Sequence, residues 1–233
     1  AKTARDEAFK GAVAAGWGYY RILTEWEYDQ GDPTTLPQGP ALFDQCLKYQ
    51  AIEDPFTVYR DPACPLHEPW KARFCLITED IPKEEFTRRW PTAIATGVDA
   101  FAAVGITMPE WFPETSVRVA DYFYVEYHNQ PEIALLSNGM TVPSAQVATV
   151  LAGDPGVTVL QRRTPVTRTV RLAKITGAEV LEGNDNQTAG RMWSGSMIPV
   201  IPVYGESLTV EGKCTKRGLV RPTRDLLRAY NYE

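Results

Sequence analysis

The side chains of this sequence that are best suited to binding a metal are three cysteines and one histidine between residues 46 and 75. Cys64 and His67 stand in Cys-Pro-Leu-His, Cys75 follows them, and Cys46 precedes them. Thiolate and imidazole are ligands that zinc prefers, but structural zinc sites commonly hold pairs of cysteines separated by two residues. This stretch has no such pair and no apparent disulfide framework. Structural cysteines inside a core are the better interpretation, and we predict no metal site.

Hydrolytic chemistry has little to draw on in this chain. It contains two histidines, His67 and His128, and no Gly-x-Ser-x-Gly turn that would present a serine nucleophile. The acidic pair Glu84–Glu85 suits the first turn of a helix, where carboxylates stabilise the helix dipole. Asp121 and Glu126 differ in strand parity and should face apart, so they make a poor acid and base pair. The sequence therefore predicts a protein that is not an enzyme.

Glycine turns that could hold a nucleotide are also poorly matched. Gly16-Trp-Gly18 precedes an expected strand, whereas the glycine turn of a dinucleotide site follows one. Gly212 and Lys213 lack the upstream glycine of a phosphate-binding loop. No run approaches the roughly 20 apolar residues that a membrane helix needs. We expect neither a cofactor nor a membrane partner.

The net charge of −5 is unevenly distributed over the 233 residues. Residues 1–154 contain 12 Lys and Arg against 22 Asp and Glu, whereas residues 155–233 contain 12 against 7. Two windows hold only basic charges: Arg162, Arg163, Arg168, Arg171 and Lys174, then Lys213, Lys216, Arg217, Arg221 and Arg224. Three interpretations stay open, namely solvated strand faces, a face that meets the acidic face of a neighbouring copy, and contact with nucleic-acid phosphate.

Strand and helix patterns follow one another irregularly, which favours an α+β fold, rich in strands in mixed or antiparallel sheets, with several short helices. Ser144 should cap one of these helices. Strands are expected over 19–28, 46–52, 56–59, 74–78 and 116–128, with a hairpin over 166–174 and 178–181. Helices are expected over 4–15, 82–90, 92–105 and 144–152, and loops over 31–40 and 184–195.

The last fifth of the chain has three parts with distinct physics. Residues 200–203 favour a strand, but Pro199 and Pro202 cannot donate ladder hydrogen bonds, so we expect an edge or irregular strand. Glu211-Gly212 between two short alternating runs predicts a hairpin. A helix should then begin at Pro222, and because the chain stops soon afterwards, we expect a segment of a longer protein.

The expected C-terminal helix carries both charge and apolar residues. Asp225 falls in its first turn, and Leu226, Leu227 and Tyr230 are spaced to form one apolar stripe.

Five stretches spread over most of the chain carry a likeness to a known family. They are Gly16–Trp26, Asp54–Ala63, Ile77–Phe86, Ile201-Pro-Val-Tyr-Gly-Glu206 and Gly218–Tyr232. In this order they resemble the portal proteins of short-tailed bacteriophages (podoviruses). None of the five is a chemical motif by itself, and the specificity lies in their ordered combination.

The resemblance implies a structural subunit of a dodecameric ring at one capsid vertex, the conduit for DNA packaging and genome ejection. It implies several partners: the terminase large subunit, capsid and scaffolding proteins, tail and head-completion proteins, and double-stranded DNA that passes without sequence-specific contact. Assembly would take place in the cytoplasm of the host bacterium. The alternative is a non-portal virion module, or a protein-binding module, built of strands and without catalysis.

The resemblance also implies that residues 1–233 form one wing-like α+β unit of a portal subunit. A finer division separates an α+β core over 1–130, a β-rich part over 131–221 and the start of a stem-directed helix over 222–233. At the subunit interface we predict a set of charged residues that pair with the neighbouring copy: Arg221, Arg224, Asp225 and Arg228.

Overall fold

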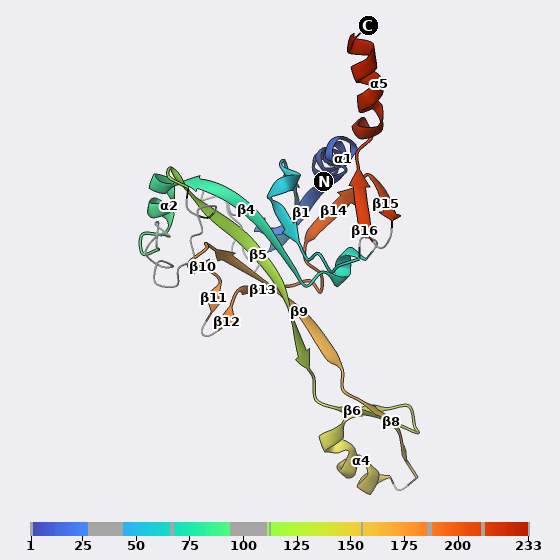
Figure 1. Ribbon diagram of the computed structural model, residues 1–233. Coiled ribbons are helices and arrows are strands. Elements are labelled where there is room, and N and C mark those ends of the chain that lie inside the picture. The colour runs from blue at the N-terminus through green and yellow to red at the C-terminus, as the bar shows by residue number, and fades with distance from the viewer. Residues whose placement is uncertain are drawn as a thin grey trace.

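The computed structural model describes residues 2–27, 44–65, 68–93, 111, 113–154, 156–185, 188–210 and 213–232. Its α-helices are α1 (Lys2–Ala15), α2 (Lys83–Arg89), α4 (Val147–Gly153) and α5 (Val220–Tyr232). In the sequence, strands that form antiparallel sheets separate these helices. The architecture in Figure 1 confirms the predicted α+β class.

The largest sheet has the strand order β10-β9-β5-β4-β3, with β13 as a further partner of β9. Every pairing in it is antiparallel. On the central strand β5, Val117, Val119 and Phe123 are buried, as the alternation of the sequence predicts. The strands are β3 (Val58–Arg60), β4 (Phe74–Pro82), β5 (Ser116–Asn129), β9 (Val166–Ile175), β10 (Val180–Glu182) and β13 (Arg191–Trp193).

A second sheet has the order β14-β1-β2, and helix α1 lies on one of its faces. Ala4, Ala8 and Ala12 form the buried stripe of α1, and a Cβ on Gly18 of β1 would lie 1.9 Å from the Ala8 carbonyl oxygen. Only small residues allow such a close approach of helix and strand. The strands are β1 (Trp17–Trp26), β2 (Gln45–Ile52) and β14 (Val200–Tyr204), the last an edge strand as expected.

The two sheets share one hydrophobic core. It brings together Tyr19 of β1, Cys75 of β4, Phe123 of β5, Val170 of β9 and Val200 of β14. Burial raises the pKa of the Tyr19 hydroxyl to about 12, so this side chain stays neutral. Both faces of β1 are therefore covered near its start, one by α1 and the other by the large sheet.

A small lobe stands apart at the end of the long ribbon that β5 and β9 form (Figure 1). This distal lobe (133–163) consists of β6 (Ile133–Leu136), β7 (Thr141–Pro143), the 3-10 turn Ser144–Gln146, α4 and β8 (Val159–Arg163). It has its own core, in which Leu136 is fully buried.

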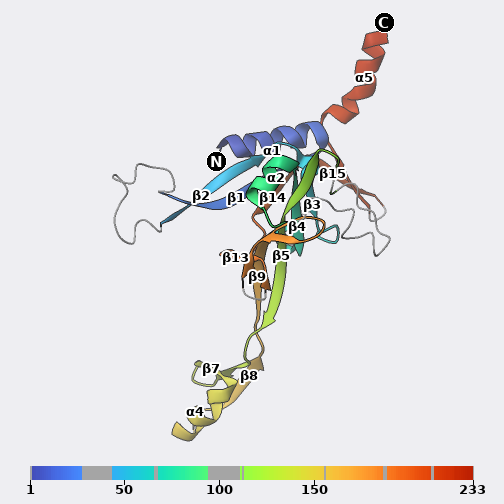
Figure 2. The ribbon, with the colours of Figure 1, turned by 90° about the vertical axis from the view of Figure 1, so that its left-hand side faces the viewer.

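The chain closes with the hairpin β15 (Glu206–Val210) and β16 (Lys213–Arg217), which confirms the predicted hairpin, and then with α5. Figures 1 and 2 show α5 projecting away from the sheets. None of the helices in the described ranges is both long and apolar enough to cross a lipid bilayer.

Four local expectations were wrong. The expected strand 56–59 starts only at Val58, because Pro55–Thr57 form a 3-10 turn that the Asp54 side chain caps. Ser144 is not a helix cap, because its hydroxyl donates to Glu132 Oε2 at 2.5 Å and the 3-10 turn begins after Pro143. The expected loop 184–195 contains β13, which pairs with the edge of β9, and the short strands β11 (Asn184–Asp185) and β12 (Thr188–Ala189), which pair with each other. Helix α5 begins at Val220, before Pro222, so Asp225 falls outside its first turn.

Some expectations cannot be compared with the structure. The loop 31–40, most of the helix 92–105, His67 and the turn 211–212 all lie outside the described residues.

Candidate subunit interface

Helix α5 is held to the body by a glycine junction, the meeting point of Gly16, Gly205 and Gly218. Gly205 N–H donates to Gly16 O at 2.9 Å, and Leu219 N–H donates to Val13 O at 2.9 Å. A Cβ on Gly218 would lie 2.4 Å from Val13 O, and one on Gly205 would lie 2.7 Å from a carbonyl oxygen of α1. The end of α1, the β14–β15 connection and the start of α5 thus meet backbone to backbone.

Beyond this junction α5 offers an uncovered amphipathic surface. Val220, Leu227 and Tyr230 share one face by their spacing, and their side chains are 52%, 54% and 79% exposed. A helix of about 12–15 residues is only marginally stable in water without tertiary contacts. The apolar stripe of α5 is therefore suited to packing against something outside this chain.

The predicted interface residues fall beside that stripe. Arg221, Arg224 and Arg228 recur at three- and four-residue spacing, share one face of α5 and are exposed. Asp225 lies on the same helix. The structure thus brings the three arginines onto one surface next to the apolar stripe.

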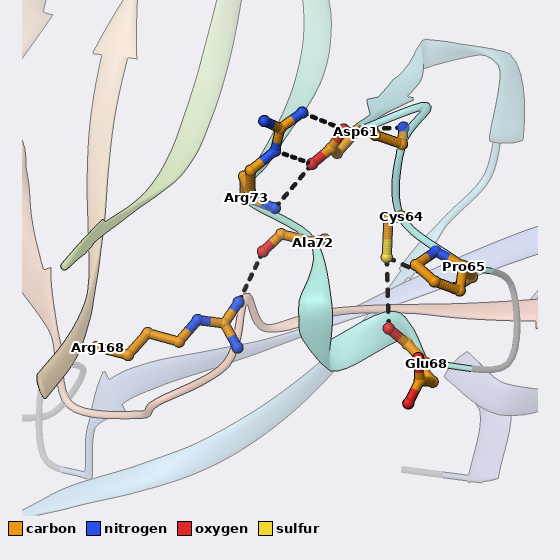
Figure 3. A network of polar contacts seen from close by, with 8 residues as sticks. Asp61, Cys64, Pro65, Glu68, Ala72, Arg73 and Arg168 are labelled. Carbon is orange, nitrogen blue, oxygen red and sulfur yellow. Dashed lines mark hydrogen bonds and ion pairs between the residues drawn. The ribbon is translucent and has the colours of Figure 1, made fainter. Parts of the chain in front are cut away.

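A second feature is the loop between β3 and β4, which Asp61 holds in place (Figure 3). Its carboxylate accepts from Arg73 Nε at 2.7 Å, from Arg73 Nη2 at 3.1 Å and from Ala63 N–H at 3.0 Å. The Asp61 side chain is 1% exposed. Its hydrogen bonds with Arg73 lower its pKa to about 2.

This loop forms one wall of a cleft of about 910 Å³, and the hairpin strand β16 forms another. Inside, Arg60 Nη1 donates to the Tyr204 hydroxyl at 2.7 Å. Lys216 Nζ lies 4.3 Å from the centre of the Tyr204 ring and 5.8 Å from that of Trp17. Phe56, whose ring packs edge-on against Trp17 with 5.4 Å between centres, is 61% exposed. The cleft combines aromatic walls with two cations.

The first basic window does not form a free face. Arg171 Nε lies 2.6 Å from a carboxylate oxygen of Glu126, and Lys174 Nζ lies 2.8 Å from one of Asp121. The guanidinium of Arg168 donates to two backbone carbonyls, one of them Ala72 O at 2.7 Å (Figure 3). These charges stabilise the fold, whereas the second window supplies the cleft and α5.

The candidate ligands that the structure describes, Cys46, Cys64 and Cys75, do not gather around a common point. Cys75 is buried in the core, where desolvation raises the pKa of its thiol to about 12, and Cys46 is exposed on β2. His128 Nε2 stands 3.3 Å from Glu126 Oε2, which is also bonded to Arg171. In the part of the chain that the structure describes, no three His, Cys, Asp or Glu side chains gather as a metal site would require.

Sequence reasoning missed the cleft entirely. Arg60, Tyr204 and Lys216 come from distant parts of the chain, and no local spacing relates them. The usable signal was indirect: Lys216 belongs to a basic window, and Arg60 and Tyr204 lie in two of the stretches that carry the family resemblance.

The sequence matches one family model over its whole length. The model of the phage P22-like portal protein matches residues 1–233. Portal proteins are structural, non-catalytic subunits of the phage particle that form homo-oligomeric rings. Because the match spans the whole sequence, the chain belongs to the P22-like portal protein family.

Proposed function

We propose that this chain is a subunit of the dodecameric portal ring at one vertex of the capsid, the conduit for DNA packaging and ejection. The family match over residues 1–233 carries this proposal. In this role the ring docks the terminase large subunit during packaging, and head-completion and tail proteins afterwards, and contacts capsid and scaffolding proteins. It assembles in the host cytoplasm and remains in the virion.

Within this proposal most of residues 1–221 form the wing and α5 leads toward the stem. The projection of α5 from the body and its exposed apolar stripe support a packing role between neighbouring copies. Arg221, Arg224 and Arg228 then face acidic groups of the next copy, and Asp225 belongs to the same interface. Apolar contact supplies affinity, and the charges set the register.

The charge of the chain suits a conduit. A net charge of −5 disfavours adhesion of DNA to the subunit as a whole, and four of the five cations of the first basic window are bonded within the chain. Double-stranded DNA therefore passes with only weak phosphate contact.

The decisive experiment measures the mass of the 233-residue chain and of the complete portal subunit in solution, by light scattering and native mass spectrometry. We expect a closed twelve-subunit ring from the complete subunit, visible by negative-stain electron microscopy. A complete subunit that stays monomeric at every concentration would overturn the proposal.

The α5 contact has its own test. In the complete subunit, L227S combined with Y230S should abolish the ring while the thermal unfolding of the monomer changes little, since exposed residues contribute little to folding stability. The matched control is L160S, at the 63% exposed Leu160 of the distal lobe. An unchanged ring in the α5 variant, or an equal loss in the control, would argue against this contact.

Charge reversal tests the arginines of α5 separately from its apolar stripe. R221E with R224E should weaken the ring at least tenfold, and R163E, an exposed arginine of the distal lobe, serves as the control.

A further inference from the structure

Among the residues that the structure describes, no carboxylate lining the Arg60–Lys216 cleft pairs with either of these two cations. Asp61 is the acidic residue among the cleft-lining positions of the described chain, and Arg73 already occupies its carboxylate. Arg60 donates to the neutral Tyr204 hydroxyl and to Pro69 O, and Lys216 contacts aromatic rings. An anionic group that entered the cleft would find two cationic donors.

Lys216 is placed at an energetic cost that an anion would offset. Its pKa is lowered, first by burial and then by the nearby positive charge of Arg60. A half-buried ammonium beside a second cation gains stability from an opposite charge within about 4–6 Å. The aromatic walls also favour a partner that brings an apolar side chain with its carboxylate.

The other end of the molecule has the complementary chemistry. The β1–β2 ribbon stays paired out to Glu27, whose N–H donates to Asp44 O at 2.9 Å. Trp26 stands beside Glu27 and is 45% exposed. Asp44, beside Glu27 on the neighbouring strand end, is exposed as well, whereas Glu25 is already paired with Lys48 at 2.8 Å. The ribbon end is thus both acidic and aromatic.

Ribbon and hairpin lie on opposite sides of the body. Figure 2 shows β1 and β2 reaching out on one side and β15 on the other. Two complementary patches at different places on one molecule make head-to-tail contacts, and such contacts close into a ring when the rotation between copies permits it.

We propose that the acidic end of the β1–β2 ribbon of one copy docks in the Arg60–Lys216 cleft of the next, with Glu27 facing Lys216 and Trp26 against the aromatic wall. This contact rests on the ring assembly proposed above and names a surface for it separate from α5. Each copy donates one ribbon and accepts one.

A charge swap in the complete subunit tests the pairing. K216E and E27K should each raise the concentration needed for ring formation about tenfold, and the double variant should restore it, because the swapped charges again attract across each contact. K10E, an exposed reversal on α1, is the control and should leave assembly unchanged. Circular dichroism of each variant checks that it folds. Losses that simply add in the double variant would overturn the pairing.

Native thiols give a second, independent test. Exposed Cys46 lies opposite Glu25 on the ribbon, while exposed Cys214 and half-buried Cys64 line the cleft. A short bismaleimide should therefore link one copy to the next and produce a ladder of covalent oligomers. Peptide mapping should join Cys46 to Cys214 or Cys64, and C46S should remove the ladder.

The outcomes separate the two proposals. A ring that forms normally, resists the charge swap and gives no link through Cys46 would overturn the cleft contact and leave the portal assignment intact. A complete subunit that neither assembles nor cross-links would count against both.

Discussion

Asp61 and Gly218 illustrate two ways in which a single residue holds this fold. Asp61 gathers donors from both ends of the β3–β4 loop, so one buried carboxylate fixes a wall of the cleft. Gly218 contributes by having no side chain, because the carbonyl groups of α1 occupy the space that a Cβ would need. Neither role leaves a local signature in the sequence.

Asp61 should make stability fall in acid. Its pKa is about 2 in the folded protein against an ordinary value of 3.8, so the unfolded chain binds the proton first as pH falls. The stabilisation is complete above pH 4 and is lost as pH falls through 2. Urea unfolding should show a lower midpoint for D61N than for wild type at pH 7, and a difference that narrows between pH 4 and 2. D6N, at an exposed site on α1, is the control.

Gly218 should not tolerate a methyl group. The new Cβ of G218A would stand 2.4 Å from Val13 O, so α1 and α5 must separate. Overpacking of this kind costs about 1–3 kcal/mol, measurable by urea unfolding. G153A, at the end of α4 with no atom within 4 Å of the new Cβ, should be neutral or slightly stabilising.

At the scale of elements, prediction succeeded where the signal was local. Helix α2 has Glu84 and Glu85 in its first turn and Arg88 and Arg89 in its last, and it lies within one residue of its expected bounds. The alternation in residues 116–128 likewise identified β5. Competing tertiary contacts explain the failures: Ser144 bonds Glu132 in place of a helix N–H, and β9 draws residues 191–193 into a sheet.

The sequence predicted the arginines of the candidate interface on α5 but not the cleft. The stripe of Arg221, Arg224 and Arg228 follows from helical spacing, which is a local property. The cleft joins β3, β14 and β16, and no pattern within one element reveals which side chains a tertiary packing will bring together.

The distal lobe should unfold independently of the two sheets, because its core makes a separate cluster. L136A removes a fully buried side chain and should cost about 2–5 kcal/mol locally. Hydrogen exchange should then be accelerated over residues 133–163, while residues 117–123 of β5 keep their protection. Equal acceleration in both regions would show that the lobe and the sheets form one cooperative unit.

At the scale of the whole molecule, the uneven charge makes assembly depend on salt. Residues 1–154 are strongly acidic, and the second basic window lies at the opposite end of the sequence. Because the Debye length falls from about 10 Å at 0.1 M to about 3 Å at 1 M, salt weakens contacts between such surfaces. Light scattering should show that the ring dissociates at a higher protein concentration in 0.5 M salt than in 0.05 M salt. A ring strengthened by salt would mean that the apolar stripe of α5 dominates.

The backbone contacts at the glycine junction set the direction of α5 independently of the surface that α5 presents to a partner. The direction in which α5 leaves the body depends on Gly16, Gly205 and Gly218, which lie outside the helix. What α5 recognises depends on the side chains that it exposes, among them Leu227 and Tyr230. A lineage can therefore exchange the surface of the helix to follow a changing partner and still inherit the same angle of approach. Three small residues set the direction of the helix, and its exposed side chains set what it recognises.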